Sequence, residues 1–219
     1  MVIVCGIDEA GRGPVLGSLV IAGVTLDEKD LDKLETLGVK DSKLLTKEKR
    51  EELFEKIKEL VLEYKIIKVS PSEIDHVLEK TSSNLNWLEA DKSIEIIDSF
   101  KEVDKAIIDC PSSNCEKYEN YVKKSLNNDV ELVVEHKADF NYLIVAAASI
   151  LAKVVRDREM EEIKKKYGDC GPGYPSNSIT MKFVRENIDK YPEIFRRSWA
   201  TFKREKGVKK QKSLGDYGS

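Results

Sequence analysis

The sequence predicts an α/β fold in which a mixed five-stranded sheet is flanked by helices and followed by a small helical, basic C-terminal extension. Three observations predict this fold. Short β-branched runs alternate with segments of helical periodicity, a glycine-rich connection joins the first two runs as in a hairpin, and the later runs are far enough apart for helical crossovers. With 219 residues, 41% of them hydrophobic, the chain can bury one sizeable core.

The first three strands and the first helix are predicted near the N-terminus. Residues 2–8 and 18–25 are rich in β-branched side chains and are expected to form the two strands of the hairpin. Apolar residues then recur at helical spacing after Thr46, a suitable N-cap, so we expect a helix over 47–62. Residues 64–69 read as the third strand.

Two capping boxes announce further helices. Ser70 stands three residues before Glu73, and Pro71 occupies the first helical position between them. Ser113 and Glu116 repeat the same spacing. We therefore expect helices to begin at Pro71 and shortly after Ser113.

The remaining elements alternate between helix and strand. Helical periodicity predicts helices over 85–100 and 142–166, and β-branched runs predict strands over 105–109 and 131–136. Glycine and proline then crowd residues 168–175, which no helix or strand would tolerate. One or two terminal helices are expected to follow this loop.

The composition excludes several classes of protein. No apolar run approaches the roughly 20 residues that a bilayer span requires, and the N-terminus lacks the basic region of a secretory signal. The four cysteines are sparse, form no Cys-x-x-Cys pair that would indicate zinc, and read as reduced thiols. We expect a cytoplasmic monomer that does not associate with membranes.

Basic residues gather near the C-terminus although the formal net charge of the chain is −3. Eight basic residues against Glu205 alone give residues 196–212 a formal charge of +7. Such a block is typical either of a solvated surface helix or of a contact with a polyanion. The sequence leaves both interpretations open.

Acidic side chains stand at the ends of three predicted strands. Asp8 ends the first strand, Asp109 ends the strand over 105–109, and Asp139 follows the strand over 131–136. Ligand sites in open α/β sheets gather beyond the carboxyl ends of strands, so these acids could converge there around hard divalent cations such as Mg²⁺. The alternative is that each acid caps or solvates its own element, since 40 acidic residues place several at strand ends by chance.

A second acid and a glycine-rich segment follow Asp8. In an unbroken strand Asp8 and Glu9 point to opposite faces, so both can serve one site only if the strand bends there. Gly11 and Gly13 supply conformational freedom, and with Arg12 they form a segment whose backbone can approach a sugar-phosphate closely. The alternative is a tight hairpin without a binding role.

Polar residues recur along one face of the predicted helix over 142–166. Ser149, Lys153 and Arg156 are spaced at i, i+4 and i+7, just beyond Asp139, and could line a nucleic-acid groove. Lys153 and Arg156 could instead pair with neighbouring acids, as exposed ion pairs commonly do.

Several motifs together resemble ribonuclease HII, particularly its archaeal form. They are GIDEAGRGPVLGSLV over 6–20, DSKLL over 41–45, the Asp109 strand, KAD over 137–139 followed by AAASILAKVVRD over 146–157, and GYPS over 173–176. The resemblance implies a ribonuclease H-like catalytic domain over residues 1–176 and a helical, basic extension over 177–219. It implies endonucleolytic hydrolysis of the RNA strand in RNA/DNA hybrids, and of ribonucleotides embedded in duplex DNA, leaving 3′-hydroxyl and 5′-phosphate ends.

The resemblance also implies roles for individual residues. The catalytic, metal-binding acids are expected to be Asp8, Glu9, Asp109 and Asp139, with Mg²⁺ or Mn²⁺ as cofactor. The backbone of the Gly-Arg-Gly segment would read the 2′-hydroxyl, and Tyr174 would stack on the sugar at an RNA-to-DNA junction. The expected substrate-binding residues are Gly11, Arg12, Gly13, Lys43, Ser149, Lys153 and Tyr174.

Two rival functions use parts of the same pattern. A metal-dependent phosphatase or nucleotide hydrolase would employ the same acids on small phosphates. The second rival is a non-catalytic nucleic-acid-binding module, an interpretation that only the basic C-terminal residues support. Metal-dependent cleavage of a hybrid distinguishes the nuclease from both.

Overall fold

The computed structural model describes residues 1–39, 45–79 and 83–215, with side chains described as far as Gly207. These residues form two compact units. The first unit comprises Met1–Ala10, Val20–Lys68 and Asn84–Arg156, and the second comprises Gly11–Leu19, Val69–Ser83 and Asp157–Ser219. Every helix in the described ranges is too short or too polar to cross a membrane.

The first unit is built on a five-stranded sheet in the order β3-β2-β1-β4-β5. β1 is antiparallel to β2, its hairpin partner, and parallel to β4, which is in turn parallel to β5. The expected mixed sheet is therefore confirmed. The strands are β1 Ile3–Ala10, β2 Leu19–Asp27, β3 Glu63–Val69, β4 Lys105–Asp109 and β5 Glu131–Glu135.

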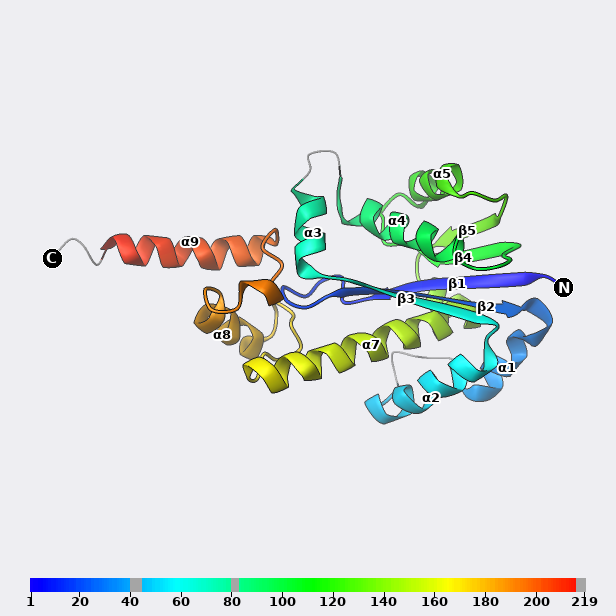
Figure 1. Cartoon of the computed structure of the whole chain (residues 1–219), viewed down its shortest axis with the longest axis horizontal. Helices are drawn as coiled ribbons and strands as arrows, with labels where there is room; N and C mark the ends of the chain where they lie inside the picture. Colours follow the sequence, from blue (N-terminus) through cyan, green and yellow to red (C-terminus); the bar gives the residue numbers. More distant parts are fainter. Residues whose placement is uncertain (40–44, 80–82, 216–219) are drawn as a thin grey trace. The chain divides into compact units, whose positions relative to one another are not determined.

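Helices cover both faces of this sheet. Figure 1 shows α4 and α5 on one face, and α1, α2 and the first part of α7 on the other. A β-carbon at Gly6 would lie 2.5 Å from the carbonyl carbon of Ile144, so only glycine lets the start of α7 pack directly on β1. The helices are α1 Leu31–Leu37, α2 Lys47–Leu60, α4 Leu85–Ile97, α5 Cys115–Ser125, α6 Ala138–Asn141 and α7 Leu143–Tyr167.

The small apolar residues of α7 form the centre of the main core. The segment 144–152 is almost entirely buried and packs in one cluster with β1, β2 and the apolar faces of α1 and α2. Alanines let helix and sheet approach closely, so this cluster fills its space without large side chains. The packing holds the N-terminal part of α7 against the strand that carries Asp8.

Most predicted elements are confirmed, and the differences are local. The α5 capping prediction is wrong by one residue, because Asn114, not Ser113, caps the helix and accepts a 2.8 Å hydrogen bond from the Lys117 amide. β1 continues to Ala10, so Asp8 lies inside the strand rather than at its last position. The short helices α1 and α6 were not predicted, since neither is long enough to show helical periodicity.

The second unit contains the loop over 11–18, α3 Pro71–Leu78, the later part of α7, α8 Ser178–Asn187 and α9 Ala200–Gly215. The two helices expected after the glycine-rich loop are α8 and α9. Ser70 caps α3 by accepting from the Glu73 amide, as the capping box predicts. A second apolar cluster, which includes Leu16, Phe183 and Phe195, forms the core of this unit.

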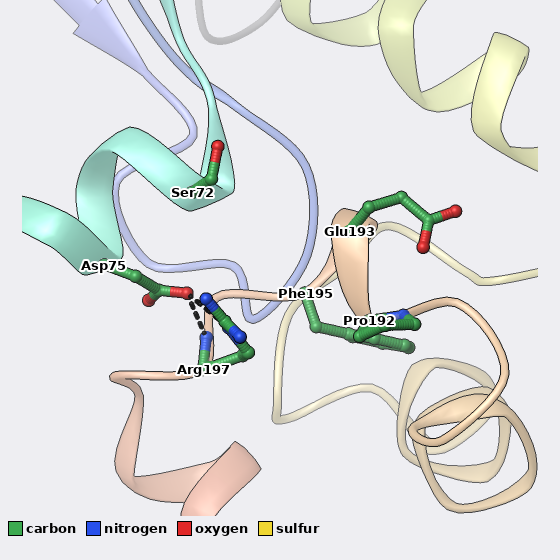
Figure 2. A pocket seen from close by; sticks show the side chains of 6 residues that line it. All are labelled: Ser72, Asp75, Pro192, Glu193, Phe195 and Arg197. Atoms are coloured by element: carbon green, nitrogen blue, oxygen red, sulfur yellow. Dashed lines mark hydrogen bonds and ion pairs between the residues drawn. The ribbon is translucent and has the colours of Figure 1, made fainter.

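A buried carboxylate ties α3 to the segment that precedes α9. Asp75 accepts hydrogen bonds from the Arg197 amide at 2.9 Å and from the Ser198 amide at 2.8 Å. Its carboxylate also pairs with the Arg197 guanidinium (Figure 2). Arg197 in the basic C-terminal stretch thus has a structural partner within its own unit.

Candidate active site

Asp8, near the end of β1, and Asp109, the last residue of β4, are neighbours on two parallel strands. The ladder between β1 and β4 runs in register as far as the pair Ile7 and Ile108, and the two aspartates follow directly. Residues in register on adjacent parallel strands lie about 4.8 Å apart and point to the same face. The parallel pairing therefore places two carboxylates side by side at one edge of the sheet.

The Asp8 carboxylate is in an unfavourable environment for a negative charge. Asp8 is only 6% exposed, and burial, together with the nearby charges of Glu9 and Asp109, raises its pKa well above the ordinary value. A hydrogen bond from the Ser149 side chain of α7 acts in the opposite direction by favouring the ionised form. The Glu9 amide also donates to Asp8 Oδ1 at 2.7 Å, which fixes the orientation of the carboxylate.

Asp139 is brought towards Asp109 by a strained turn. Lys137 adopts a left-handed conformation with φ 61°, which costs a non-glycine residue about 1 kcal/mol and reverses the chain after β5. The next amide, that of Ala138, donates to Asp109 Oδ1 at 2.9 Å. Asp139 follows immediately at the start of α6 and is 7% exposed.

Glu9 lies on the opposite face of β1 from Asp8. Both residues belong to the regular ladder with β2, where Asp8 pairs with Ala22 and Glu9 with Ile21. The bend that would turn both side chains to one face is therefore not present at Asp8 and Glu9. The chain turns only after Ala10, at Gly11 with φ 84°. Glu9 nevertheless remains close enough to contribute to the raised pKa of Asp8.

The donor set fits a hard divalent cation. Carboxylate oxygens are the ligands that Mg²⁺ and Mn²⁺ prefer, and Asp8 and Asp139 are both nearly buried. Crowding ionised carboxylates in a buried place is unfavourable unless a positive charge compensates them. Asp8, Glu9, Asp109 and Asp139 would hold such an ion.

In the second unit, one buried arginine, Arg196, donates hydrogen bonds to the backbone carbonyls of the Gly-Arg-Gly segment. Arg196 has 0% exposure, and its guanidinium donates to the carbonyl oxygens of Gly11 at 2.6 Å and Arg12 at 2.9 Å. A third bond from Arg196 reaches Gly17 O at 2.9 Å, and the Trp199 indole donates to Gly13 O at 3.4 Å. The carbonyls of the segment thus all face these two side chains.

This arrangement changes the interpretation of the basic C-terminal stretch. Arg196 is neither a solvated surface residue nor a polyanion contact, because it is the largest fully buried side chain of the described residues. Lys206 pairs with Asp189, and Arg204 pairs with Glu205. Arg196, Arg197, Arg204 and Lys206 of the stretch thus have partners within the second unit.

Tyr174 lies beside the Gly-Arg-Gly segment. A β-carbon at Gly13 would stand 3.5 Å from the Tyr174 ring, and the ring is left 42% exposed. The amide of Val15 donates to Gly173 O at 2.8 Å, which joins the two loops next to these residues. The predicted 2′-hydroxyl and sugar contacts are thereby together in one unit.

The other residues predicted to contact nucleic acid differ in their surroundings. Ser149 contacts Asp8, and Lys153 is half-buried one helical turn later. The prediction of a groove-lining role is wrong for Arg156, which is 3% exposed and belongs to the interior. Lys43 lies outside the described residues.

The model for the family described as Ribonuclease HII matches residues 5–202 of the chain. The chain belongs to the ribonuclease HII family. Ribonuclease HII of Thermococcus sibiricus is 47% identical over 213 residues, which cover 95% of this chain and 93% of that protein. The activity of the ribonuclease HII family is endonucleolytic cleavage of the RNA strand in RNA/DNA hybrids, and this activity depends on divalent metal ions.

Solved structures agree with the ribonuclease HII fold. Ribonuclease H2 from Pyrococcus horikoshii has a TM-score of 0.87 at 40% identity, over 94% of this chain and 98% of that one. Bst-ribonuclease HIII, solved in complex with Mn²⁺, has a TM-score of 0.79 at 22% identity, over 96% of this chain and 71% of that one. The second similarity concerns the fold alone.

One residue that supports the Gly-Arg-Gly segment of the second unit was missed from the sequence. Arg196 was counted only as one charge of a basic block, although it makes the contacts that shape the Gly-Arg-Gly segment. A signal was present, since Phe195 and Trp199 flank it and mark the start of the block as partly apolar. A solvated helix would not concentrate aromatic residues there.

We expect the Asp8→Asn substitution to stabilise the metal-free protein. Because the folded state raises the pKa of Asp8, it binds more protons than the unfolded state, and stability falls as pH rises above the ordinary aspartate value of roughly 4. Asparagine keeps the Oδ1 acceptor but removes the charge. The free energy of unfolding at pH 7.5 should therefore rise by about 1 kcal/mol, measured by denaturant titration with a chelator present.

The control for this substitution is Asp129→Asn, which removes an exposed carboxylate. It should leave the stability at pH 7.5 unchanged. A lower stability for Asp8→Asn than for the control at pH 7.5 would contradict the electrostatic account of Asp8.

Proposed function

We propose that this chain, as a member of the ribonuclease HII family, also cuts at single ribonucleotides embedded in duplex DNA, by attack of water and with 3′-hydroxyl and 5′-phosphate products. The observation that carries the proposal is the parallel register of β1 and β4, which sets Asp8 beside Asp109. The Ala138 amide connects Asp109 to the residue preceding Asp139. These contacts supply the oxygen donors that phosphodiester hydrolysis with divalent ions requires.

Two of the four acids, Asp8 and Asp109, are oriented by hydrogen bonds. Ser149 and the Glu9 amide orient Asp8, and the Ala138 amide orients Asp109. Mg²⁺ or Mn²⁺ ions, when bound, orient and acidify the attacking water and neutralise charge on the leaving 3′-oxygen. Glu9 approaches from the other face of β1, so we assign it to the rim of the metal site.

We propose that the Gly-Arg-Gly segment recognises the 2′-hydroxyl through its backbone. Since the C=O and N–H of a peptide point in opposite directions, carbonyls bound by Arg196 leave the Arg12 and Gly13 amides directed away from it. Duplexes containing RNA are recognised by shape and 2′-hydroxyls rather than by base edges. Arg12, Lys43, Ser149 and Lys153 are proposed to support substrate binding, and Tyr174 to stack on the sugar.

We propose that the protein consists of a catalytic domain and a C-terminal extension. Residues 1–176 contain all the proposed catalytic and substrate-binding residues, and residues 177–219 form the extension that supplies Arg196. The four cysteines carry thiols rather than disulfides, which fits a reducing cytoplasm. We propose that the protein acts there as a monomer on RNA/DNA hybrids and ribonucleotide-containing duplex DNA.

The activity is tested with duplex DNA carrying one ribonucleotide, incubated with Mg²⁺, with Mn²⁺ or with chelator, and mapped for cut position and end chemistry. We expect a single cut beside the ribonucleotide only when a divalent ion is present. Cleavage of long hybrids but not of this duplex would contradict the embedded-ribonucleotide proposal. Turnover of p-nitrophenyl phosphate without hybrid cleavage would favour the phosphatase alternative.

Tyr174→Ala is expected to reduce cleavage at a single embedded ribonucleotide about tenfold or more, if packing of the ring on the nucleotide is comparable to base stacking, which contributes about 1–3 kcal/mol. Binding to plain duplex DNA should change much less. Tyr174→Phe is the matched control, since it keeps the ring against Gly13 and should retain most of the activity. Equal losses in cleavage and plain-duplex binding would exclude junction recognition by Tyr174.

A further inference from the structure

Three sulfur and nitrogen donors that have no part in the proposed nuclease chemistry lie together in the first unit. Cys110 follows β4, Cys115 begins α5, and His136 follows β5. Their ligand atoms all lie within 4.8 Å of one another. Cys110 is buried, Cys115 half-buried and His136 exposed, so the cluster is open on one side.

The distances suit tetrahedral coordination. Cys115 Sγ lies 3.4 Å from His136 Nε2. In a tetrahedral zinc site, with Zn–S of about 2.3 Å and Zn–N of about 2.0–2.1 Å, the sulfur and nitrogen ligands are about 3.6 Å apart. Two of the three donors thus already stand at ligand separation, and Cys110 needs only a small movement of its side chain.

The histidine is oriented as a metal ligand would be. Its Nδ1 lies 3.1 Å from the carbonyl oxygen of Cys110. A carbonyl can only accept, so Nδ1 carries the proton, and in the neutral ring Nε2 presents its lone pair towards Cys115. A backbone carbonyl in this role is the usual outer partner of a metal-bound histidine.

The fold assembles this cluster from residues far apart in the sequence. β4 and β5 run parallel with Asp109 opposite Glu135, and the Cys110 amide donates to Glu135 O at 2.9 Å. Cys110 and His136 therefore emerge together at the strand ends. The turn that leads to Asn114, the N-cap of α5, returns Cys115 to the same place.

We propose that Cys110, Cys115 and His136 bind a thiophilic divalent cation of the Zn²⁺ class, with a fourth position open to solvent. Soft thiolate and imidazole donors select this class of ion, whereas the carboxylates at the end of β1 and β4 select hard cations. The two sites are joined through the peptide between Asp109 and Cys110. An ion bound to the thiols fixes the end of β4 and the start of α5.

The site is tested by titrating the full chain, reduced and in excess Mg²⁺, with Co²⁺. One equivalent should produce thiolate-to-cobalt charge-transfer absorption and the intense visible bands of tetrahedral Co²⁺, and one equivalent of Zn²⁺ should remove them. Six-coordinate Co²⁺ on carboxylates gives only weak visible bands and no thiolate absorption. A spectrum of that weak kind alone would overturn the proposal.

Substitutions assign the absorption to these residues. His136→Gln and Cys115→Ser should each weaken Co²⁺ binding by at least tenfold, because loss of a mere outer partner of a metal ligand already costs roughly 10–100-fold in affinity. His76→Gln changes the other histidine of the chain, and Cys170→Ser a thiol of the second unit, so both should keep the wild-type spectrum. An unchanged spectrum in His136→Gln, whose exposed side chain can be replaced without disturbing the core, would also overturn the site.

Discussion

Asp109→Asn is expected to abolish hybrid cleavage while leaving hybrid binding within about tenfold of the wild type. Asparagine keeps the Oδ1 acceptor for the Ala138 amide, so the turn that carries Asp139 should survive. What is lost is one charged oxygen donor beside Asp8. A bound divalent ion contributes several kcal/mol to the transition state, so we expect a loss in rate of about a thousandfold or more.

This prediction is checked by single-turnover cleavage and by equilibrium binding of the same hybrid with Ca²⁺ present. Asp129→Asn removes an exposed acid that precedes β5, at the opposite end of that strand from Asp139; it is the matched control and should cleave normally. Wild-type-like cleavage by Asp109→Asn would remove Asp109 from the active centre. A parallel collapse of binding and cleavage would instead assign it a structural role.

Arg196→Lys is expected to impair recognition of the ribonucleotide while leaving the four proposed metal-binding acids unchanged. Lysine keeps the positive charge, but its single ammonium cannot reproduce the planar fork that serves Gly11, Arg12 and Gly17 together. At least one buried carbonyl then loses its donor, at a cost of about 1–3 kcal/mol. We expect a loss of about tenfold or more in cleavage at a single embedded ribonucleotide.

Two measurements separate this positioning role from general destabilisation. Plain-duplex binding should remain near wild type in Arg196→Lys, and kcat at saturating substrate should fall, because the Gly-Arg-Gly segment is misplaced rather than removed. Arg197→Lys is the matched control, since that side chain is 56% exposed and pairs with Asp75. Equal losses in the two variants would contradict the specific role of Arg196.

Local signals in the sequence were sufficient for most of the fold. Thr46 and Ser70 cap their helices as predicted, and the strand over 105–109 was located to the residue. These predictions succeed because capping and alternation depend on near neighbours. The Asn114 cap was missed because Ser112, Ser113 and Asn114 all offer capping side chains within three residues.

The candidate site was less predictable because its geometry depends on long-range pairing. The strand-end positions of Asp109 and Asp139 indicated convergence, but the register that places Asp8 beside Asp109 is a property of the assembled sheet. Arg196 illustrates the same limit, since it binds carbonyls 179 to 185 residues earlier in the chain. Composition counts such a residue as surface charge, and only the fold reveals its burial.

The most direct test is an anomalous diffraction map from crystals of the protein soaked in Mn²⁺. We expect a manganese peak in contact with carboxylate oxygens of Asp8, Asp109 and Asp139, with Glu9 at the rim. Manganese bound elsewhere, with these carboxylates directed away from one another, would contradict the proposed metal site.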